Sequence, residues 1–251
     1  MVATATKGCQ ESSTRLVEGS QVAPYTADTN SLFEASLMEQ GNRVLPLFPL
    51  SAVLFPDAAM PLRIFEDRYK LMVQRCLESD SEFGVVMIKS GFEVGGPAET
   101  YSVGTVARIF DVQRREDGTT RIAVAGRERF RINSITQQLP YLEGQVTLLS
   151  EDPGEALSQD ELMAVRRITA AQVRLVHGLN GGWIREPRLP DDPVALSYFI
   201  AAFLQVEGDE KQAVLEESAT ADRLKLELSL LKRDRSGLEE RVAKKLGREP
   251  G

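Results

Sequence analysis

The sequence predicts an α+β protein in which a β-rich half is followed by a helical half. Between residues 44 and 150, short apolar segments of strand length alternate with turn residues around a single helical pattern. From residue 151 to 251, apolar residues instead recur at the three- and four-residue spacing of amphipathic helices. Residues 1–43 are polar and precede both halves, so we expect them to form a flexible tail.

The segment at residues 44–69 opens the β-rich half and combines large apolar side chains with four prolines, Pro46, Pro49, Pro56 and Pro61. Proline has no amide hydrogen and fixes φ, so this density argues against one long helix or a central strand. The apolar side chains must nevertheless be buried. We therefore expect short extended pieces, each restarted after a proline and packed on a core.

Further strands follow at close spacing. Residues 66–77 form the one helix expected in this half, with Cys76 on its apolar stripe. The Glu-Asp-Gly-Thr sequence at 116–119 predicts a hairpin turn, because glycine supplies the positive φ that such turns require. The expected strands are residues 61–65, 83–89, 102–114, 120–125, 127–135 and 141–149. Six or so strands with one helix indicate a small barrel or half-barrel.

Helices are expected throughout the second half. Ser158 and Glu161 form a capping box, in which each side chain satisfies a free amide at the start of a helix. Asp192 caps another helix, with Pro193 at its first position. The expected helices are residues 158–177, 194–204, 210–217 and 220–246. The apolar stripe of the last one predicts that it packs in a helical bundle.

Composition excludes several classes of protein. The net charge of −7 over 251 residues does not indicate a nucleic-acid-binding protein. No apolar run approaches the roughly 18–20 residues of a membrane helix, and the first 43 residues lack the pattern of a signal or transit peptide. Cys9 and Cys76 are too few for a disulfide framework, so we expect a reduced, buried Cys76 and a cytoplasmic protein, or a stromal one if the source has plastids.

No catalytic, cofactor or metal site is expected. The sequence contains no G-x-x-x-x-G-K-[ST] segment, so ATP binding by a P-loop is not predicted. His177 is the only histidine, and its place at a helix end favours a capping role over catalysis. One histidine and two distant cysteines provide no set of metal ligands.

Three arginines form the sharpest polar pattern of the chain. The period-two spacing of Arg127, Arg129 and Arg131 places their guanidinium groups on one face of a strand, with Phe130 and Ile132 toward the core. Such a row could contact phosphates. The alternative is a solvated strand face paired with acids of neighbouring strands, and the near-neutral charge of the β-rich half favours it.

Several motifs occur together in a fixed order. They are LPLFPL (45–50), VLFP (53–56), MPLRIFEDRY (60–69), VGTVARI (103–109), DGT (117–119), AGRERFRI (125–132), PYLEGQV (140–146), DPVALSYFIAAFL (192–204), EKQAVLEE (210–217) and ADRLKLELSLL (221–231). In this order they closely resemble the N-terminal, substrate-binding LON domain of the Lon protease family. The resemblance implies a PUA-like β-barrel domain at 44–150 followed by a helical bundle at 151–251. It also implies a stand-alone LON-domain protein, since no ATPase or peptidase motif follows.

This resemblance sets the functional expectation. We expect a non-enzymatic module that binds proteins or peptides, acting as a substrate-recognition adaptor in protein quality control or assembly. Its partners would be unfolded or specific client proteins, with a protease or assembly factor as a further candidate, and no ATP, cofactor or membrane. Phe55, Met60 and Phe65, beside a groove between the two halves, are the candidate contacts. RNA binding through Arg127, Arg129 and Arg131 is the alternative, and a small hydrolase comes third.

Overall fold

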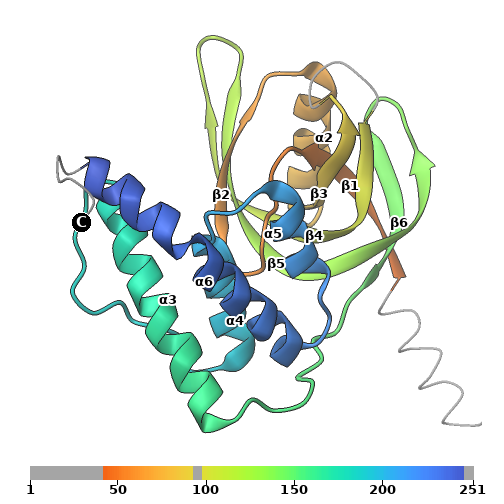
Figure 1. Cartoon of the computed structure of the whole chain (residues 1–251). Helices are drawn as coiled ribbons and strands as arrows, with labels where there is room; N and C mark the ends of the chain where they lie inside the picture. The colour runs from red at the N-terminus through yellow and green to blue at the C-terminus, as the bar shows by residue number, and fades with distance from the viewer. Residues whose placement is uncertain (1–41, 93–97, 246–251) are drawn as a thin grey trace, which may run out of the picture. The chain divides into compact units, whose positions relative to one another are not determined.

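The computed structural model describes residues 42–92 and 98–245, and the expected tail up to residue 41, with Cys9, lies outside them. The strands in these ranges are β1 (Asn42–Leu50), β2 (Ala59–Ile64), β3 (Glu82–Gly91), β4 (Ala98–Arg114), β5 (Thr120–Gln137) and β6 (Leu142–Leu148). The helices are α2 (Asp67–Leu77), α3 (Gln159–Leu179), α4 (Pro193–Phe203), α5 (Gly208–Glu216) and α6 (Thr220–Lys245). Apart from α2, which lies between β2 and β3, the helices follow all the strands along the chain, so the predicted α+β class is confirmed (Figure 1).

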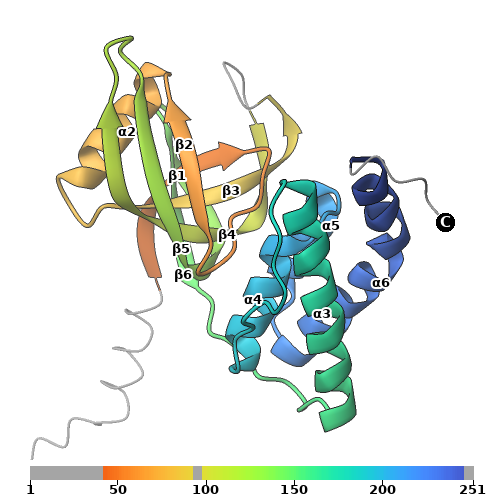
Figure 2. The same ribbon diagram turned by 90° about the vertical axis from the view of Figure 1, so that its left-hand side faces the viewer.

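The six strands form one mixed sheet that closes on itself. Their order is β2-β5-β4-β3-β1-β6, and an additional pairing of β5 with β6 joins five of them into a ring of strands. β2 lies outside the ring and pairs only with the first part of β5. Figure 2 shows that part of β5, with β2 and the end of β4, projecting beyond the ring.

The position of β1 corrects the expectation that its prolines exclude a central strand. β1 lies between β3 and β6, although it contains Pro46 and Pro49. The two neighbours pair with different parts of it: β6 with residues 42–47, in antiparallel register, and β3 with residues 47–50, in parallel register. Because the strand changes partner at Leu47, each proline lies where only one side of the strand is paired, and its missing amide hydrogen disrupts no ladder.

A second correction concerns β5. Residues 120–125 and 127–135 form one continuous strand instead of two. The register with β4 shifts between Gly126, opposite Ala107, and Arg129, opposite Thr105. One extra residue is therefore accommodated on β5 as a β-bulge. The bulge bends the strand, so that β5 forms part of both the ring and the projecting hairpin.

Three apolar clusters stabilise the fold. The ring interior is filled by Leu45, Leu47, Val86, Val106, Phe130 and Val146. The Phe130 ring fits there because its Cζ approaches Gly84 and Gly104 so closely that a Cβ at either glycine would lie within 2.8 Å of it. A second cluster joins α2 to the sheet through Tyr69, Met72, Val73 and Cys76, so Cys76 lies on the buried face of this helix as expected. The third unites α3, α4, α5 and α6 with Phe55 and Val103.

The helix starts follow the predicted capping. Ser158 and Glu161 form the expected capping box at α3, and the Asp192 side chain accepts a hydrogen bond from the Ala195 amide at the start of α4. α3 continues to Leu179, two residues beyond the predicted end, and the His177 ring contacts the carbonyl oxygen of Val173 at 3.1 Å. Within the described residues, no helix is long and apolar enough to cross a membrane.

Candidate functional site

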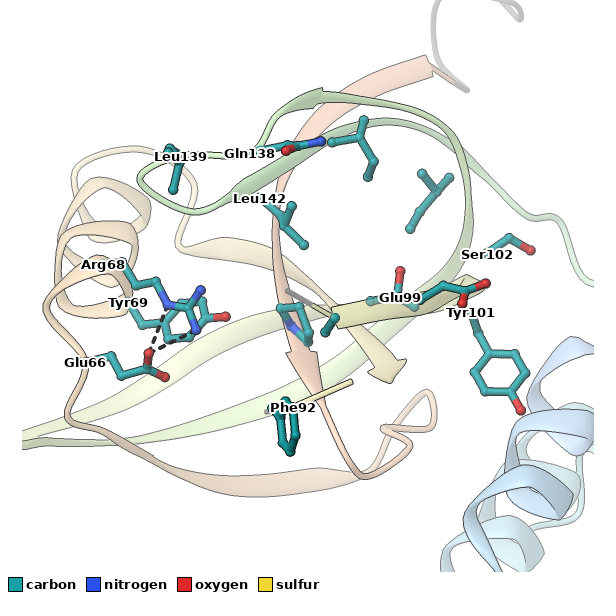
Figure 3. A pocket seen from close by; sticks show the side chains of 15 residues that line it. Glu66, Arg68, Tyr69, Phe92, Glu99, Tyr101, Ser102, Gln138, Leu139 and Leu142 are labelled. Atoms are coloured by element: carbon teal, nitrogen blue, oxygen red, sulfur yellow. Dashed lines mark hydrogen bonds and ion pairs between the residues drawn. The ribbon is translucent and has the colours of Figure 1, made fainter. Parts of the chain in front are cut away.

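A large cavity lies at the β region, where the end of β5 and the start of β6 meet α2 and the start of β4. Its volume is about 920 Å³. We call it the apolar groove and define it by six lining side chains: Pro49, Phe92, Ile132, Ile135, Leu139 and Leu142. Figure 3 shows Leu139 and Leu142 on one side of this space, Glu66, Arg68 and Tyr69 on a second, and Tyr101 and Ser102 on a third.

The groove is distinguished by apolar side chains that face solvent. Leu139 is 81% exposed, Phe92 74% and Ile135 42%. Large apolar side chains gathered at one cavity are unfavourable in water, and such exposed patches mark binding sites on soluble proteins. Ile132 and Leu142 pack on the ring interior and give the groove a fixed floor.

The charged residues that line the groove are all in ion pairs: Glu66 with Arg68, and Glu99 with Lys89, whose Nζ lies 3.7 Å from Oε1. Glu66 Oε2 accepts a hydrogen bond from Arg68 Nε at 3.0 Å and forms an ion pair with Nη2 at 2.9 Å (Figure 3). The Arg68 guanidinium also lies 4.5 Å from the centre of the Tyr69 ring. The Tyr101 hydroxyl donates to Asp209 Oδ1 of α5 at 3.1 Å. This pairing leaves an apolar surface with polar groups at its rim, a combination that suits an uncharged, apolar ligand segment.

The structure separates the three apolar residues that the sequence singled out. Phe55 is 3% exposed and belongs to the cluster shared with the helices. Met60 is partly buried against the α2 cluster, and Phe65 is 48% exposed at the end of β2. None of the three lines the apolar groove, and a partner could reach only Phe65 and the exposed part of Met60.

The expectation of a solvated arginine row is wrong for Arg129. Arg127 and Arg131 are exposed, but the Arg129 side chain is 0% exposed. The bulge after Gly126 breaks the strict alternation, and helical residues cover this part of β5. Arg129 Nη1 donates to the carbonyl oxygens of Leu215 and Glu217, at 2.9 Å and 2.7 Å, so it is not available to a phosphate.

Arg129 instead belongs to a buried polar network between the β region and the helices. Glu151 accepts from Arg129 Nε and from Arg223 Nη2, each at 3.0 Å, and the Tyr198 hydroxyl also donates to it. Arg223 lies 4.4 Å over the Tyr198 ring. Burial, and then the hydrogen bond to Glu151, raise the pKa of Tyr198, so its hydroxyl remains a donor. One carboxylate therefore compensates two buried guanidinium groups.

Glu227 adds a titratable group to this region and leads to a pH prediction. Its side chain is 0% exposed, and Ser197 Oγ donates to it at 3.0 Å. Burial raises the pKa of Glu227 well above 4.5, and the hydrogen bond from Ser197 and the positive charge of Arg223 offset this only in part. A carboxyl whose pKa is raised by folding contributes stability below its unfolded pKa and loses it as the pH rises through the folded pKa.

We therefore expect wild type to lose stability relative to Glu227→Gln as the pH rises above 4.5. Urea denaturation of both proteins at pH values from about 4 to about 8 measures the difference in free energy of unfolding. Parallel pH profiles would contradict a protonated, buried Glu227.

Residues considered for catalysis have structural roles. Burial raises the pKa of the Cys76 thiol to about 12, so the thiolate required for nucleophilic attack is scarce at neutral pH. The His177 ring stacks on Phe203, with centroids 6.3 Å apart. Among residues 42–92 and 98–245, no three His, Cys, Asp or Glu side chains gather where they could hold a metal ion.

Comparison with known proteins decides the family. The family described as "ATP-dependent protease La (LON) substrate-binding domain" matches residues 44–233. The chain belongs to this family. The Lon N-terminal domain protein from Xanthomonas campestris shares the fold, with a TM-score of 0.59 and 26% identity over 74% of this chain and 98% of that one. The N-terminal domain of the Mycobacterium avium complex Lon protease is similar in fold, with a TM-score of 0.50 and 17% identity.

Whole Lon proteases match this LON domain only at part of their length. Lon protease 2 of Myxococcus xanthus is 29% identical over 197 residues, which are 77% of this chain and 24% of that protein. The Lon protease of Cytophaga hutchinsonii is 26% identical over 213 residues, 25% of its length. The chain thus spans about a quarter of these relatives, in the substrate-binding region.

Sequence reasoning missed the groove residues Phe92, Ile135 and Leu139. One signal was present, because Phe92 follows a glycine and Leu139 precedes a proline, so both are large apolar residues at positions typical of turns. Turns lie at the surface, and an apolar side chain there is more often exposed than one within a strand. Their convergence depends on ring closure, which no local pattern contains.

Proposed function

We propose that this LON domain recognises other proteins by binding short extended segments of their chains in the apolar groove. The observation that carries the proposal is the gathering of Phe92, Ile135 and Leu139, all substantially exposed, around one cavity of about 920 Å³. Family membership supports it, because the family is described by substrate binding. The relatives are proteases, so the clients would be proteins selected for proteolysis or assembly, with the domain acting as an adaptor in the cytoplasm.

The ligand class follows from the lining. Burying one large apolar side chain contributes roughly 1.5–3 kcal/mol, so a few such contacts support a weak, reversible complex. Glu66 is paired with Arg68, and Glu99 is paired with Lys89, so the lining has little unpaired charge for recognising an ionic ligand. We therefore expect uncharged segments rich in Leu or Phe to bind better than charged ones.

Substitutions in the groove test the proposal. The probe is a fluorescein-labelled peptide of about ten residues, composed of Leu, Phe, Ser and Gln, long enough to span roughly 33 Å. We expect Phe92→Ser and Ile135→Ser each to raise its Kd about tenfold, because each removes an apolar contact worth about 1.4 kcal/mol or more. Fluorescence anisotropy with the full chain gives the Kd.

Phe110→Ser is the matched control. Phe110 is 62% exposed on β4 and does not line the groove, so its loss should leave the Kd within about twofold. Equal weakening by all three substitutions, or by none, would exclude the groove as the binding site. Circular dichroism melts confirm that each variant is folded.

A further inference from the structure

A second feature of the β region lies at the projecting hairpin, away from the apolar groove. Four arginines gather there: Arg63 of β2, Arg114 at the end of β4, Arg115 in the turn and Arg121 of β5. With Glu116, Asp117 and Thr119 they line an open cavity of about 610 Å³. We call this the arginine cluster. Figure 2 shows the hairpin that carries it extending beyond the ring of strands.

The cluster is positively charged within an acidic protein. Its lining has four arginines and two acids, a net charge of 4 − 2 = +2, whereas the whole chain carries −7. Among the residues that the structure describes, the one ion pair within the cluster joins Arg63 Nη2 to Asp117 Oδ2 at 3.4 Å. The other oxygen of Asp117 accepts from the Thr119 amide and hydroxyl, at 2.9 Å and 2.7 Å, and holds the turn.

The strand register makes this arrangement unfavourable for folding. Arg63 and Arg121 are direct cross-strand partners in the β2–β5 pairing. Like charges directly opposite each other destabilise an antiparallel pair. Arg114 is opposite Thr120, the residue next to Arg121, which adds to the local density of positive charge. A bound anion between these side chains would remove the repulsion.

The geometry fits carboxylates of a protein better than a nucleic acid. A guanidinium group offers a planar fork of donors that matches a carboxylate in a bidentate manner. Single-stranded nucleic acids also need aromatic side chains for base stacking, and the cluster has none in its lining. A long polyanion would further be repelled by the net negative charge of the rest of the chain. We propose that the arginine cluster binds a short acidic segment of a partner protein.

A charge-reversal experiment tests this assignment. The probe is a fluorescein-labelled peptide of about ten residues of alternating Glu and Ser, titrated with the full chain at low salt. The double variant Arg115→Glu/Arg121→Glu should raise the Kd about tenfold or more, because the acidic peptide then meets like charges. The matched control is Arg127→Glu/Arg131→Glu, which makes the same change of charge at exposed residues of β5 outside the cluster. It should change the Kd by no more than about twofold.

The outcomes discriminate clearly. If both double variants weaken binding equally, or if neither does, the arginine cluster is not a defined site. If an oligouridine of about ten nucleotides binds more tightly than the acidic peptide, the assignment to a protein ligand is wrong.

Arg121→Thr provides a milder variant: we expect weaker peptide binding together with a raised Tm, because the charge repulsion with Arg63 is relieved. A lowered Tm would contradict the inference that Arg63 and Arg121 repel each other across the strand pair. Ile135→Ser should leave acidic-peptide binding unchanged, so this site and the apolar groove are tested independently.

Discussion

Replacing Glu151 with alanine is expected to lower the free energy of unfolding by about 3–5 kcal/mol. Glu151 is the one carboxylate paired with both Arg129 and Arg223, whose side chains are 0% exposed. Without it, two buried guanidinium groups lose their compensating charge, and removing one partner of a buried ion pair is strongly destabilising. Equilibrium urea denaturation, followed by circular dichroism, measures the loss.

Glu155→Ala is the matched control for this substitution. Glu155 is an exposed acid four residues further along the chain, and its side chain makes no hydrogen bond or ion pair with the residues that the structure describes. Its removal should change the free energy of unfolding by no more than about 0.5 kcal/mol. If Glu151→Ala were as mild as the control, the network would not join the β region to the helices.

Gly126→Ala is expected to lower the free energy of unfolding by about 3 kcal/mol. A Cβ at this position would lie 2.1 Å from the carbonyl oxygen of Phe55 and 2.9 Å from its carbonyl carbon. Both are backbone atoms, so relief requires the chain at 55–58 to move away from β5. That movement would also strain the hydrogen bonds from Gly126 to Ala58 and from Asp57 to Gly126, of 2.8 Å and 3.0 Å.

Gly237→Ala serves as the opposite case. Gly237 lies inside α6, and a Cβ there would meet nothing within 4 Å. Alanine has the higher helix propensity, so this variant should be more stable by about 0.5–1 kcal/mol. Thermal melts of the two variants and of wild type measure the change in stability. A higher Tm for Gly126→Ala would contradict the close backbone contact between Gly126 and Phe55.

Local sequence patterns predicted the helices, strands and turns of this fold better than they predicted which strands pair with each other. The capping box at Ser158, the cap at Asp192 and the hairpin turn at Gly118 were all correct, because each depends on residues within one turn of the chain. The place of β1 was wrong, because its two prolines are tolerated only through a change of partner at Leu47. Such a change is a property of the sheet and leaves no local signal.

The candidate site shows the same limit. The period-two spacing predicted that the Arg129 side chain faces solvent. In the structure a β-bulge changes its direction and the chain at 215–217 covers it. Phe55 was among the expected contacts because it is large and apolar, but the same property favours burial against the helices. The groove residues Phe92 and Leu139 are far apart in sequence and converge only through closure of the ring.

Hydrogen–deuterium exchange with the uncharged Leu- and Phe-containing peptide tests the central claim, binding in the apolar groove, most directly. At saturating peptide, we expect slower exchange of backbone amides at residues 132–142, which carry Ile135 and Leu139, and unchanged exchange in the hairpin at 114–121. The protection should disappear in Ile135→Ser at the same peptide concentration. Peptide binding without protection at residues 132–142 would contradict the claim.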